Sequence, residues 1–507
     1  MGKSTYKMLA CLMVLLLCCS TLVFAGYGIN GDHDSSLPDI NGDVKGYMPP
    51  NPEAYPELYD KNSGKSDRMQ VQKRTLAPKA EMAASIDRMP GQGNIEKVLA
   101  IPVYFSDIQF DADNDKAHFE LILDEMREYY ETNSQYSPGV KGISIDATVV
   151  EAVYSEKTMD YYGKDGSGID DFNTDISELA REAVQKLEAR GFDFRPFDSD
   201  SDDIIDHLFI IHAGQGQEEI NNSNLIWSHR YEIEGGEEVG GVRAKNYVMV
   251  PETGLLGTFA HEFGHDIGLP DLYDTDYYEN GISAGVGDWD LMGSGSWNRI
   301  GSAAPGSCPA NLSAWSRLYL GWTNPETVSE DLLDFIEIMN TDGISGTIKF
   351  WTDGNVSGDE YYLAEYRRKI GYDEALPGEG LLIWHVDNQW INSKIMRNAI
   401  NAYDARLGVE LEQADGKRDM WYMRNSGDDG DPFPGSSNNI NFTAVPYALN
   451  YSNIDDNVFS HVAVENISCS GDKALAVYYV ESGSQDWPAK QILPNNNRIA
   501  GTRPTFS

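Results

Sequence analysis

The sequence predicts an α+β fold in which a domain of mixed helices and strands is followed by a β-rich, sandwich-like C-terminal domain. Residues 95–330 alternate apolar strand patterns with amphipathic helix patterns, whereas residues 331–485 carry short apolar runs separated by Gly, Asp and Asn. A chain of 507 residues also exceeds the length that one hydrophobic core usually serves. We therefore expect two folded domains together with processed segments.

The N-terminus predicts a secretory signal peptide over residues 1–25. Lys3 and Lys7 precede an apolar run at 8–24, and the small residue Ala25 closes the segment. No later stretch is apolar enough to span a bilayer. We therefore expect a secreted, extracellular protein without membrane insertion.

Two further segments are predicted to lie outside the folded domains. Residues 26–94 are rich in Pro, Gly, Asn and Asp and show little periodicity, which is typical of a propeptide or an extended leader. Residues 486–507 are expected to form a loose tail.

The charge balance restricts the classes of partner. The chain has 80 acidic and 39 basic residues, a net charge of −41, and such a field repels nucleic acid and anionic membranes. We expect a monomer whose partners are protein or peptide substrates, with no nucleic acid bound. Cys308 and Cys469 are the cysteines beyond the signal peptide, and the sequence leaves open whether they pair or remain buried thiols.

The elements of the first domain follow in chain order. Residues 97–105 form an apolar strand pattern, and Pro102 within it favours an edge position. Helical patterns cover about 115–132 and 172–190, and a buried-type strand covers 204–211. In the second domain, the strand patterns are GTIKFW, EYYLAEYR, GLLIWHVD, HVAVENIS and LAVYYV.

The stretch from 253 to 274 carries the pattern of a metal site. Its apolar residues recur at helical spacing, and His261 and His265 stand four residues apart, so both imidazoles lie on one face of a helix. Imidazoles in this arrangement suit Zn²⁺, and Glu262 beside them suits a general base that acts on water activated by the metal.

The residues after this helix supply a third ligand. Gly268 allows a left-handed turn and Pro270 prevents the helix from resuming, so Asp271 can swing back towards the metal. Two histidines, one carboxylate and a water are the usual ligand set of catalytic zinc. Downstream, a glycine-rich turn holds Met292, which we expect either beneath the metal or in the core.

The pattern H-E-x-x-H-x-x-G-x-x-D with a following methionine turn resembles the metzincin-like zinc peptidases. More narrowly, the flanking segments resemble the secreted immune inhibitor A-like metallopeptidases. The resemblance covers roughly residues 95–485 and rests on IIDHLFIIHAGQGQEE, IWSH, WDLMGSGSW, SAWSRLYLGW and LPGEGLLIWHVD.

This resemblance implies a zinc endopeptidase, made as a zymogen, that hydrolyses internal peptide bonds of proteins. Position by position, it implies that the zinc ligands are His261, His265 and Asp271. It also implies that Glu262 is the general base and acid and that Met292 is the Met-turn residue. Many metzincins have histidine where this chain has Asp271, so Asp274 competes as the third ligand.

The implied zymogen needs a group from the leader that blocks the zinc. Residues 26–94 contain no cysteine, which excludes a thiolate. A carboxylate, a histidine and a backbone carbonyl of the leader remain open. The donor for the tetrahedral oxyanion is also open among Tyr273, Tyr277, Tyr278 and His229.

Acidic clusters predict a structural Ca²⁺ site. Asp198, Asp200, Asp202 and Asp206 present hard oxygen ligands in one loop, although a solvated turn has the same composition. A weaker candidate, at least as well explained by a simple turn, comprises Asp428, Asp429 and Asp431.

Three other histidines border the family-like segments. His212, His229 and His385 stand beside apolar strands, where a hydrogen-bonded core histidine is commoner than a metal ligand, and we leave them outside the metal set. An alternative function from another class is a secreted binding or adhesion protein that uses the peptidase fold as a scaffold.

Overall fold

The structure is a computed structural model, and the residues it describes are 46–58, 95–134, 142–166, 169–170, 176–276, 282–328, 336–341, 344–403, 406–443 and 460–480. The predicted signal peptide, most of the predicted leader, the predicted tail, Tyr277 and Tyr278 lie outside the described residues. Among the described residues, no helix is both long and apolar enough to cross a membrane.

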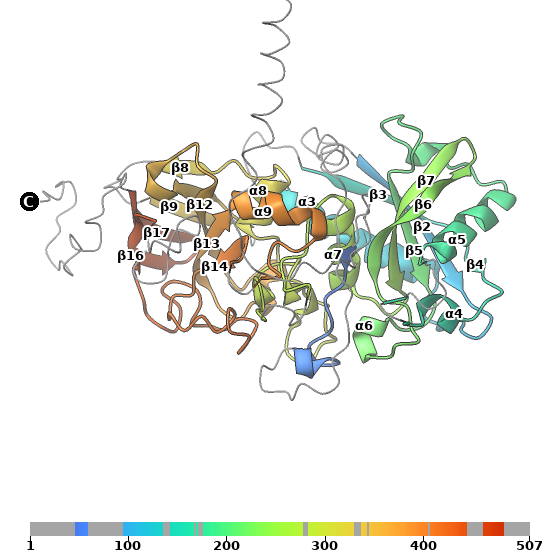
Figure 1. The fold of residues 1–507 in the computed structure, drawn as a ribbon, viewed down its shortest axis with the longest axis horizontal. Coiled ribbons are helices and arrows are strands. Elements are labelled where there is room, and N and C mark those ends of the chain that lie inside the picture. The colour runs from blue at the N-terminus through green and yellow to red at the C-terminus, as the bar shows by residue number, and fades with distance from the viewer. Residues whose placement is uncertain are drawn as a thin grey trace, which may run out of the picture. The chain divides into compact units, whose positions relative to one another are not determined.

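A seven-stranded sheet lies in the region predicted as the first domain (Figure 1). The strands lie in the order β1-β6-β7-β5-β2-β3, with β4 beside β2. Strands β7, β5, β2, β3 and β4 are parallel, whereas β6 runs antiparallel to β7 and β1 runs antiparallel to β6. The strands are β1 (Gly46–Tyr47), β2 (Ile95–Tyr104), β3 (Ser144–Val149), β4 (Val153–Tyr154), β5 (His207–His212), β6 (His229–Val239) and β7 (Val242–Pro251).

Helices cover both faces of this sheet because β5 and β7 are apolar on both sides. On one face, α3 (Lys116–Ser134) and α7 (Leu256–Asp266) share a buried core with the strands. On the other face, α5 (Glu178–Ala189) closes a second core. Two shorter helices, α4 (Met159–Gly163) and α6 (Gln217–Ile220), lie in the connections. The predicted helices and the strand preceding the metal motif are confirmed as α3, α5 and β5.

The expected edge position of the strand with Pro102 is wrong. That strand is β2, which lies between β5 and β3 inside the sheet. The proline is tolerated because β2 pairs with β3 only up to Ala100 and with β4 only from Val103. Pro102 therefore faces the gap between two short neighbours, where no ladder hydrogen bond needs its missing N–H.

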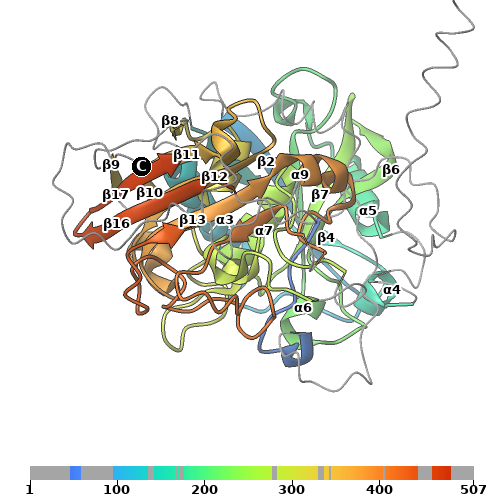
Figure 2. The ribbon, with the colours of Figure 1, turned by 60° about the vertical axis from the view of Figure 1, so that its left-hand side comes forward.

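The region predicted as the second domain contains two five-stranded sheets, and the predicted strands are confirmed there. One sheet has the order β10-β9-β17-β16-β15 and the other β14-β13-β12-β11-β8. Figure 2 shows β16 and β17 beside each other. The strands are β8 (Glu326–Val328), β9 (Ile336–Thr341), β10 (Ile344–Ser345), β11 (Thr347–Trp351), β12 (Glu360–Arg367), β13 (Gly380–Asp387), β14 (Val409–Leu411), β15 (Phe442–Thr443), β16 (Val462–Ser470) and β17 (Lys473–Val480).

The sheet of β12 and β13 contributes to two cores. Tyr362 and Ile383 point into a core that includes Val464 of the other sheet. Leu363 and Trp384, on the opposite face, belong to the same buried cluster as α3 and α7. Two helices, α8 (Ala314–Tyr319) and α9 (Asn388–Lys394), accompany this sheet. The mixed α/β class is confirmed, with several sheets and a core that joins both halves of the chain.

Candidate metal centre

Three buried side chains converge at the end of α7. The two Nε2 atoms of His261 and His265 lie 3.0 Å apart, and Asp271 Oδ1 lies 3.3 Å from the first and 3.2 Å from the second. Ligands bound tetrahedrally at about 2.0–2.2 Å are separated by roughly 3.3–3.6 Å. The two sides that meet at Asp271 Oδ1 are close to this spacing, and the side between the two Nε2 atoms is shorter.

The protonation of the two imidazoles also fits a cation. His261 Nδ1 donates to Leu291 O at 2.9 Å, and His265 Nδ1 donates to Leu269 O at 2.8 Å. In neutral imidazoles this leaves both Nε2 lone pairs aimed at each other and at a carboxylate oxygen, which is repulsive without a cation between them. The donor set and its orientation thus fit zinc.

Burial tunes the charges of these ligands. It is the largest influence on His261, whose pKa it lowers despite the nearby Asp271 carboxylate, so the ring stays neutral and able to bind a metal. Burial acts to raise the pKa of Asp271, but His265 and His261 outweigh it and hold that pKa below its usual range. Asp271 is therefore an anion.

The turn after α7 brings Asp271 beside the two histidines. Helix α7 ends at Asp266, and Gly268 has a φ of 105°, a conformation that favours glycine. The N–H of Leu269 bonds to Gly264 O at 2.9 Å and closes the helix. Asp274, the alternative ligand, accepts instead from the backbone N–H groups of Asp276 and Ser283.

Met292 lies against α7. It is fully buried, and its Sδ would stand 2.7 Å from a Cβ placed on Gly264. The residue before it supplies the carbonyl that orients His261. Glu262, the candidate base, is fully buried on the same helix turn as the histidines.

A residue that sequence reasoning missed holds Asp271 in place. Asn398 Oδ1 accepts from the backbone N–H of Asp271 at 2.7 Å, and its Nδ2 donates to Asp271 Oδ2. Asn398 adopts a left-handed conformation with a φ of 48° at the end of a short 3-10 helix of the second domain. No local sequence signal marks it, because its partner lies 127 residues away.

The leader reaches this centre. Strand β1 pairs with the start of β6, with Tyr47 opposite His229. The carbonyl oxygen of Tyr47 lies 3.2 Å from His261 Nε2 and accepts a hydrogen bond of 3.0 Å from the hydroxyl of Tyr273. A main-chain carbonyl and a phenol donor therefore meet beside the ligand triangle.

His229 and His212, which are outside the predicted metal set, are buried. His229 is held by Trp227 O at 2.6 Å and by the Tyr247 hydroxyl at 3.0 Å. Burial lowers the pKa of His212 to about 4, so this core ring is neutral.

Three of the four aspartates predicted to bind calcium lie close together in the structure. Asp198, Asp200 and Asp206 bring carboxylate oxygens within 4.8 Å of one another. Asp202 contributes its backbone N–H, which donates to Asp198 Oδ1 at 3.0 Å. In the other predicted cluster, Asp428 gathers with Asp415 and Asp419. Asp429 accepts from the Ser436 hydroxyl and Asp431 from the backbone of Asp428.

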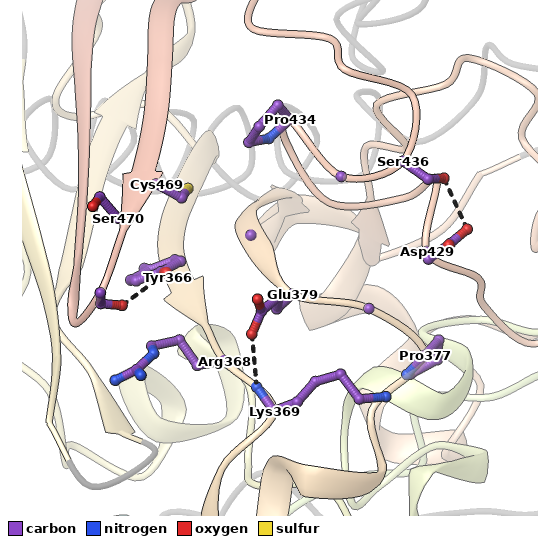
Figure 3. Close-up of a pocket in the computed structure, with 14 residues that line it drawn as sticks. Tyr366, Arg368, Lys369, Pro377, Glu379, Asp429, Pro434, Ser436, Cys469 and Ser470 are labelled. Atoms are coloured by element: carbon purple, nitrogen blue, oxygen red, sulfur yellow. Dashed lines mark hydrogen bonds between the residues drawn. The ribbon is translucent and has the colours of Figure 1, made fainter.

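A pocket of about 750 Å³ lies in the second domain, and its lining contains none of the metal-centre residues. Figure 3 shows Arg368, Lys369 and Glu379 along it, with Cys469 at one side. Cys469 and Cys308 are both free thiols in the structure.

The comparisons with known proteins agree with this geometry. Residues 102–323 match the family model of the immune inhibitor A peptidase M6 catalytic domain. The chain is 30% identical over 350 residues to the pre-pro-metalloprotease PrtV of Vibrio cholerae serotype O1, which covers 54% of this chain and 36% of that protein. It is 29% identical over 297 residues to immune inhibitor A of Bacillus thuringiensis subsp. alesti, which covers 47% of this chain and 42% of that protein.

The chain thus spans less than half the length of the curated relatives it matches. The matched region nevertheless contains α7, the turn after it and the methionine turn. Over residues 102–323 the chain is therefore similar to the catalytic domain of the immune inhibitor A peptidase M6 family.

Proposed function

We propose that the protein is a secreted zinc endopeptidase that hydrolyses internal peptide bonds of protein substrates and is made as a zymogen. The observation that carries this proposal is the buried triangle of His261, His265 and Asp271, with Glu262 on the same helix. A zinc ion held there polarises a carbonyl and lowers the pKa of water.

The chain's own residues supply the proton transfers. Glu262 takes a proton from the water whose oxygen attacks the scissile carbonyl carbon. When the C–N bond breaks, Glu262 passes that proton to the leaving amine. Tyr273 donates to the carbonyl oxygen as negative charge develops on it, which is supported by its hydrogen bond to the Tyr47 carbonyl in the leader.

Replacement of Glu262 tests this function. Glu262→Gln keeps the shape of the side chain and all three proposed ligands, so the variant should retain zinc but lose about two to four orders of magnitude in turnover. Zinc content and casein cleavage measure the two effects, with the exposed Glu128→Gln on α3 as the matched control. Near-normal cleavage by Glu262→Gln would refute the assignment. Zinc without chelator-sensitive cleavage in the native chain would favour the scaffold alternative.

We further infer that the leader inhibits the precursor through a backbone carbonyl. Tyr47 O lies beside the triangle, where a substrate carbonyl would be cleaved. Its segment is held by hydrogen bonds from Trp227 Nε1 to Met48 O and from Trp297 Nε1 to Pro49 O, each 2.8 Å long. In its described residues 46–58, the leader thereby occupies the place of a substrate through a main-chain carbonyl.

The finer fold and cofactor assignments are part of the same proposal. We infer a metzincin-like catalytic domain over residues 95–330 and a sandwich-like domain over 331–485, supported by α7 with its methionine turn and by the core that the two five-stranded sheets share. We also propose structural calcium at Asp198, Asp200 and Asp206. Calcium should raise the melting temperature of the native chain but not that of Asp200→Asn.

A further inference from the structure

A second buried polar cluster lies in the C-terminal domain, on the sheet of β12, β13 and β14. His385 stands between Tyr362 and Glu410 in the register of these three strands, so the three side chains share one face. Glu360 lies two residues before Tyr362, and Glu412 lies two residues after Glu410, so both belong to the same face. Elsewhere this face is apolar and packs into the core shared with the other sheet.

The cluster carries an excess of negative charge inside the protein. Glu360, Glu410, Glu412 and His385 are all buried, and Glu412 is only 7% exposed. Arg418 Nη2 bonds to Glu410 Oε1 at 2.8 Å. Three carboxylates thus surround one guanidinium and one imidazole. Burial acts to lower the pKa of His385, but Glu360, Glu412 and Glu410 outweigh it and raise that pKa. Buried carboxylates are costly unless protons or cations balance them.

The hydrogen bonds of His385 leave one nitrogen aimed at Glu412. Nε2 lies 2.8 Å from Glu360 Oε1, to which it donates in the neutral ring. Nδ1 then presents its lone pair to Glu412 Oε1 at 3.6 Å, beyond hydrogen-bond distance. Among the described residues, that oxygen is buried and accepts no hydrogen bond. Two lone pairs facing each other at this distance repel unless a proton or a metal ion lies between them.

We propose that His385, Glu410 and Glu412 bind a second divalent transition-metal ion, for which Zn²⁺ is the probe, in a structural site separate from the catalytic centre. One ligand atom from each residue lies within 4.8 Å of the others. The 3.6 Å between His385 Nδ1 and Glu412 Oε1 matches two tetrahedral ligands of one zinc at about 2.0–2.2 Å. An imidazole ligand favours zinc over calcium or magnesium.

Glu360 is a positioning residue for this site. By accepting from Nε2, it fixes the tautomer of His385 that offers Nδ1 to a metal, an arrangement common around protein-bound zinc. The competing occupant is a proton on Glu412, whose pKa is raised to about 8 by burial and by Glu410. Zinc stoichiometry separates the two.

The experiment uses the full-length chain with its catalytic ligands removed, His261→Ala with His265→Ala. Equilibrium dialysis against Zn²⁺ should find one zinc ion per chain in this double variant. A triple variant that also carries Glu412→Gln should take up no zinc. The exposed Glu337→Gln on β9 is the matched control and should keep the ion. No zinc uptake by the double variant would overturn the proposal.

Two further readouts guard against misfolding. Zn²⁺ should raise the melting temperature of the double variant, and Co²⁺ should give the visible absorption of a tetrahedral site with one nitrogen ligand. In the native chain, two zinc ions per molecule are expected and one would contradict the site. The result is independent of the proposed function, because the double variant lacks peptidase activity whether or not the second site exists.

Discussion

At the scale of single residues, Asn398 determines how well Asp271 can serve a metal. Its amide holds both the backbone and the carboxylate of that residue. Asn398→Gly removes these bonds while tolerating the left-handed backbone, so zinc affinity should fall about 10- to 100-fold. Competition with a chelator measures the change.

The control for this prediction is Asn222→Gly, an exposed asparagine outside the metal centre. Its zinc affinity should equal that of the native protein. If Asn398→Gly also binds zinc normally, the carboxylate is oriented by the turn after α7 alone.

Tyr273 offers a second test at this scale. Because its hydroxyl donates to a carbonyl oxygen beside the ligands, Tyr273→Phe should lower kcat of the processed protein by about 10²- to 10³-fold. KM and zinc content should change little, because the aromatic ring remains. Steady-state kinetics separate the two constants, and an unchanged kcat would exclude the phenol as the oxyanion donor.

The sequence predicts the residues of the triangle because they occupy one helix and the turn that follows it. The four-residue spacing of the histidines and the helix-breaking residues Gly268 and Pro270 can be read from the local sequence. The groups that complete the centre, Asn398 and the carbonyl of Tyr47, come from distant segments, and a carbonyl has no side-chain signature. Only tertiary structure could have selected them from the alternatives.

At the scale of elements, strand β1 fits against the metal helix through Gly46. A Cβ on Gly46 would lie 2.3 Å from two ring atoms of His265, so a larger residue must displace the leader or the ring. We expect Gly46→Val to give an unprocessed chain with increased activity on casein. Glu53→Gln, an exposed change in the same leader, should stay latent. Equal latency in both variants would argue against inhibition by this strand.

His207 of β5 forms hydrogen bonds that link this strand to the end of α7. Its ring bonds to Asp266 at 2.7 Å and to Glu96 at 3.1 Å. Burial acts to lower the pKa of His207, but these two carboxylates outweigh it and raise the pKa to about 10. The folded protein thus keeps a proton that the unfolded chain releases near pH 6.5.

The sign of the resulting pH dependence follows from linkage. The contribution of His207 to the free energy of unfolding is complete below about pH 6.5 and is lost as the pH rises towards 10. His207→Gln should therefore flatten the decline in stability over this window. Urea unfolding at several pH values measures it, and an undiminished slope would show that other groups cause the decline.

Periodicity was sufficient to predict the strands of the second domain, since β12 and β13 begin and end where their apolar runs do. It misplaced β2, because the cost of Pro102 depends on how far neighbouring strands extend. That length is a property of the assembled sheet.

At the scale of the whole molecule, a buried guanidinium ties the second domain to the loops around the methionine turn. Arg367 of β12 bonds to Asp373 and donates to Trp289 O at 3.2 Å and Asn311 O at 3.3 Å. Arg367→Ala leaves Asp373 buried without its partner, which should cost about 3–5 kcal/mol of unfolding free energy.

Denaturant unfolding measures this change in stability. Arg368→Ala is the control, because the side chain of Arg368 lines the pocket of Figure 3. A small effect at Arg367 would mean that the apolar core alone holds the halves together. The domain boundary at residue 330 stays a prediction, since apolar side chains on both sides of it share one core.

The distance along the chain between Asp271 and Asn398 has a consequence for biosynthesis. These partners are 127 residues apart, so a nascent polypeptide exposes the metal ligands well before the amide that aligns them is synthesised. We expect prematurely terminated products to capture zinc poorly and to remain inert. Late completion of the centre would protect the producing cell from its own hydrolase until translation has finished.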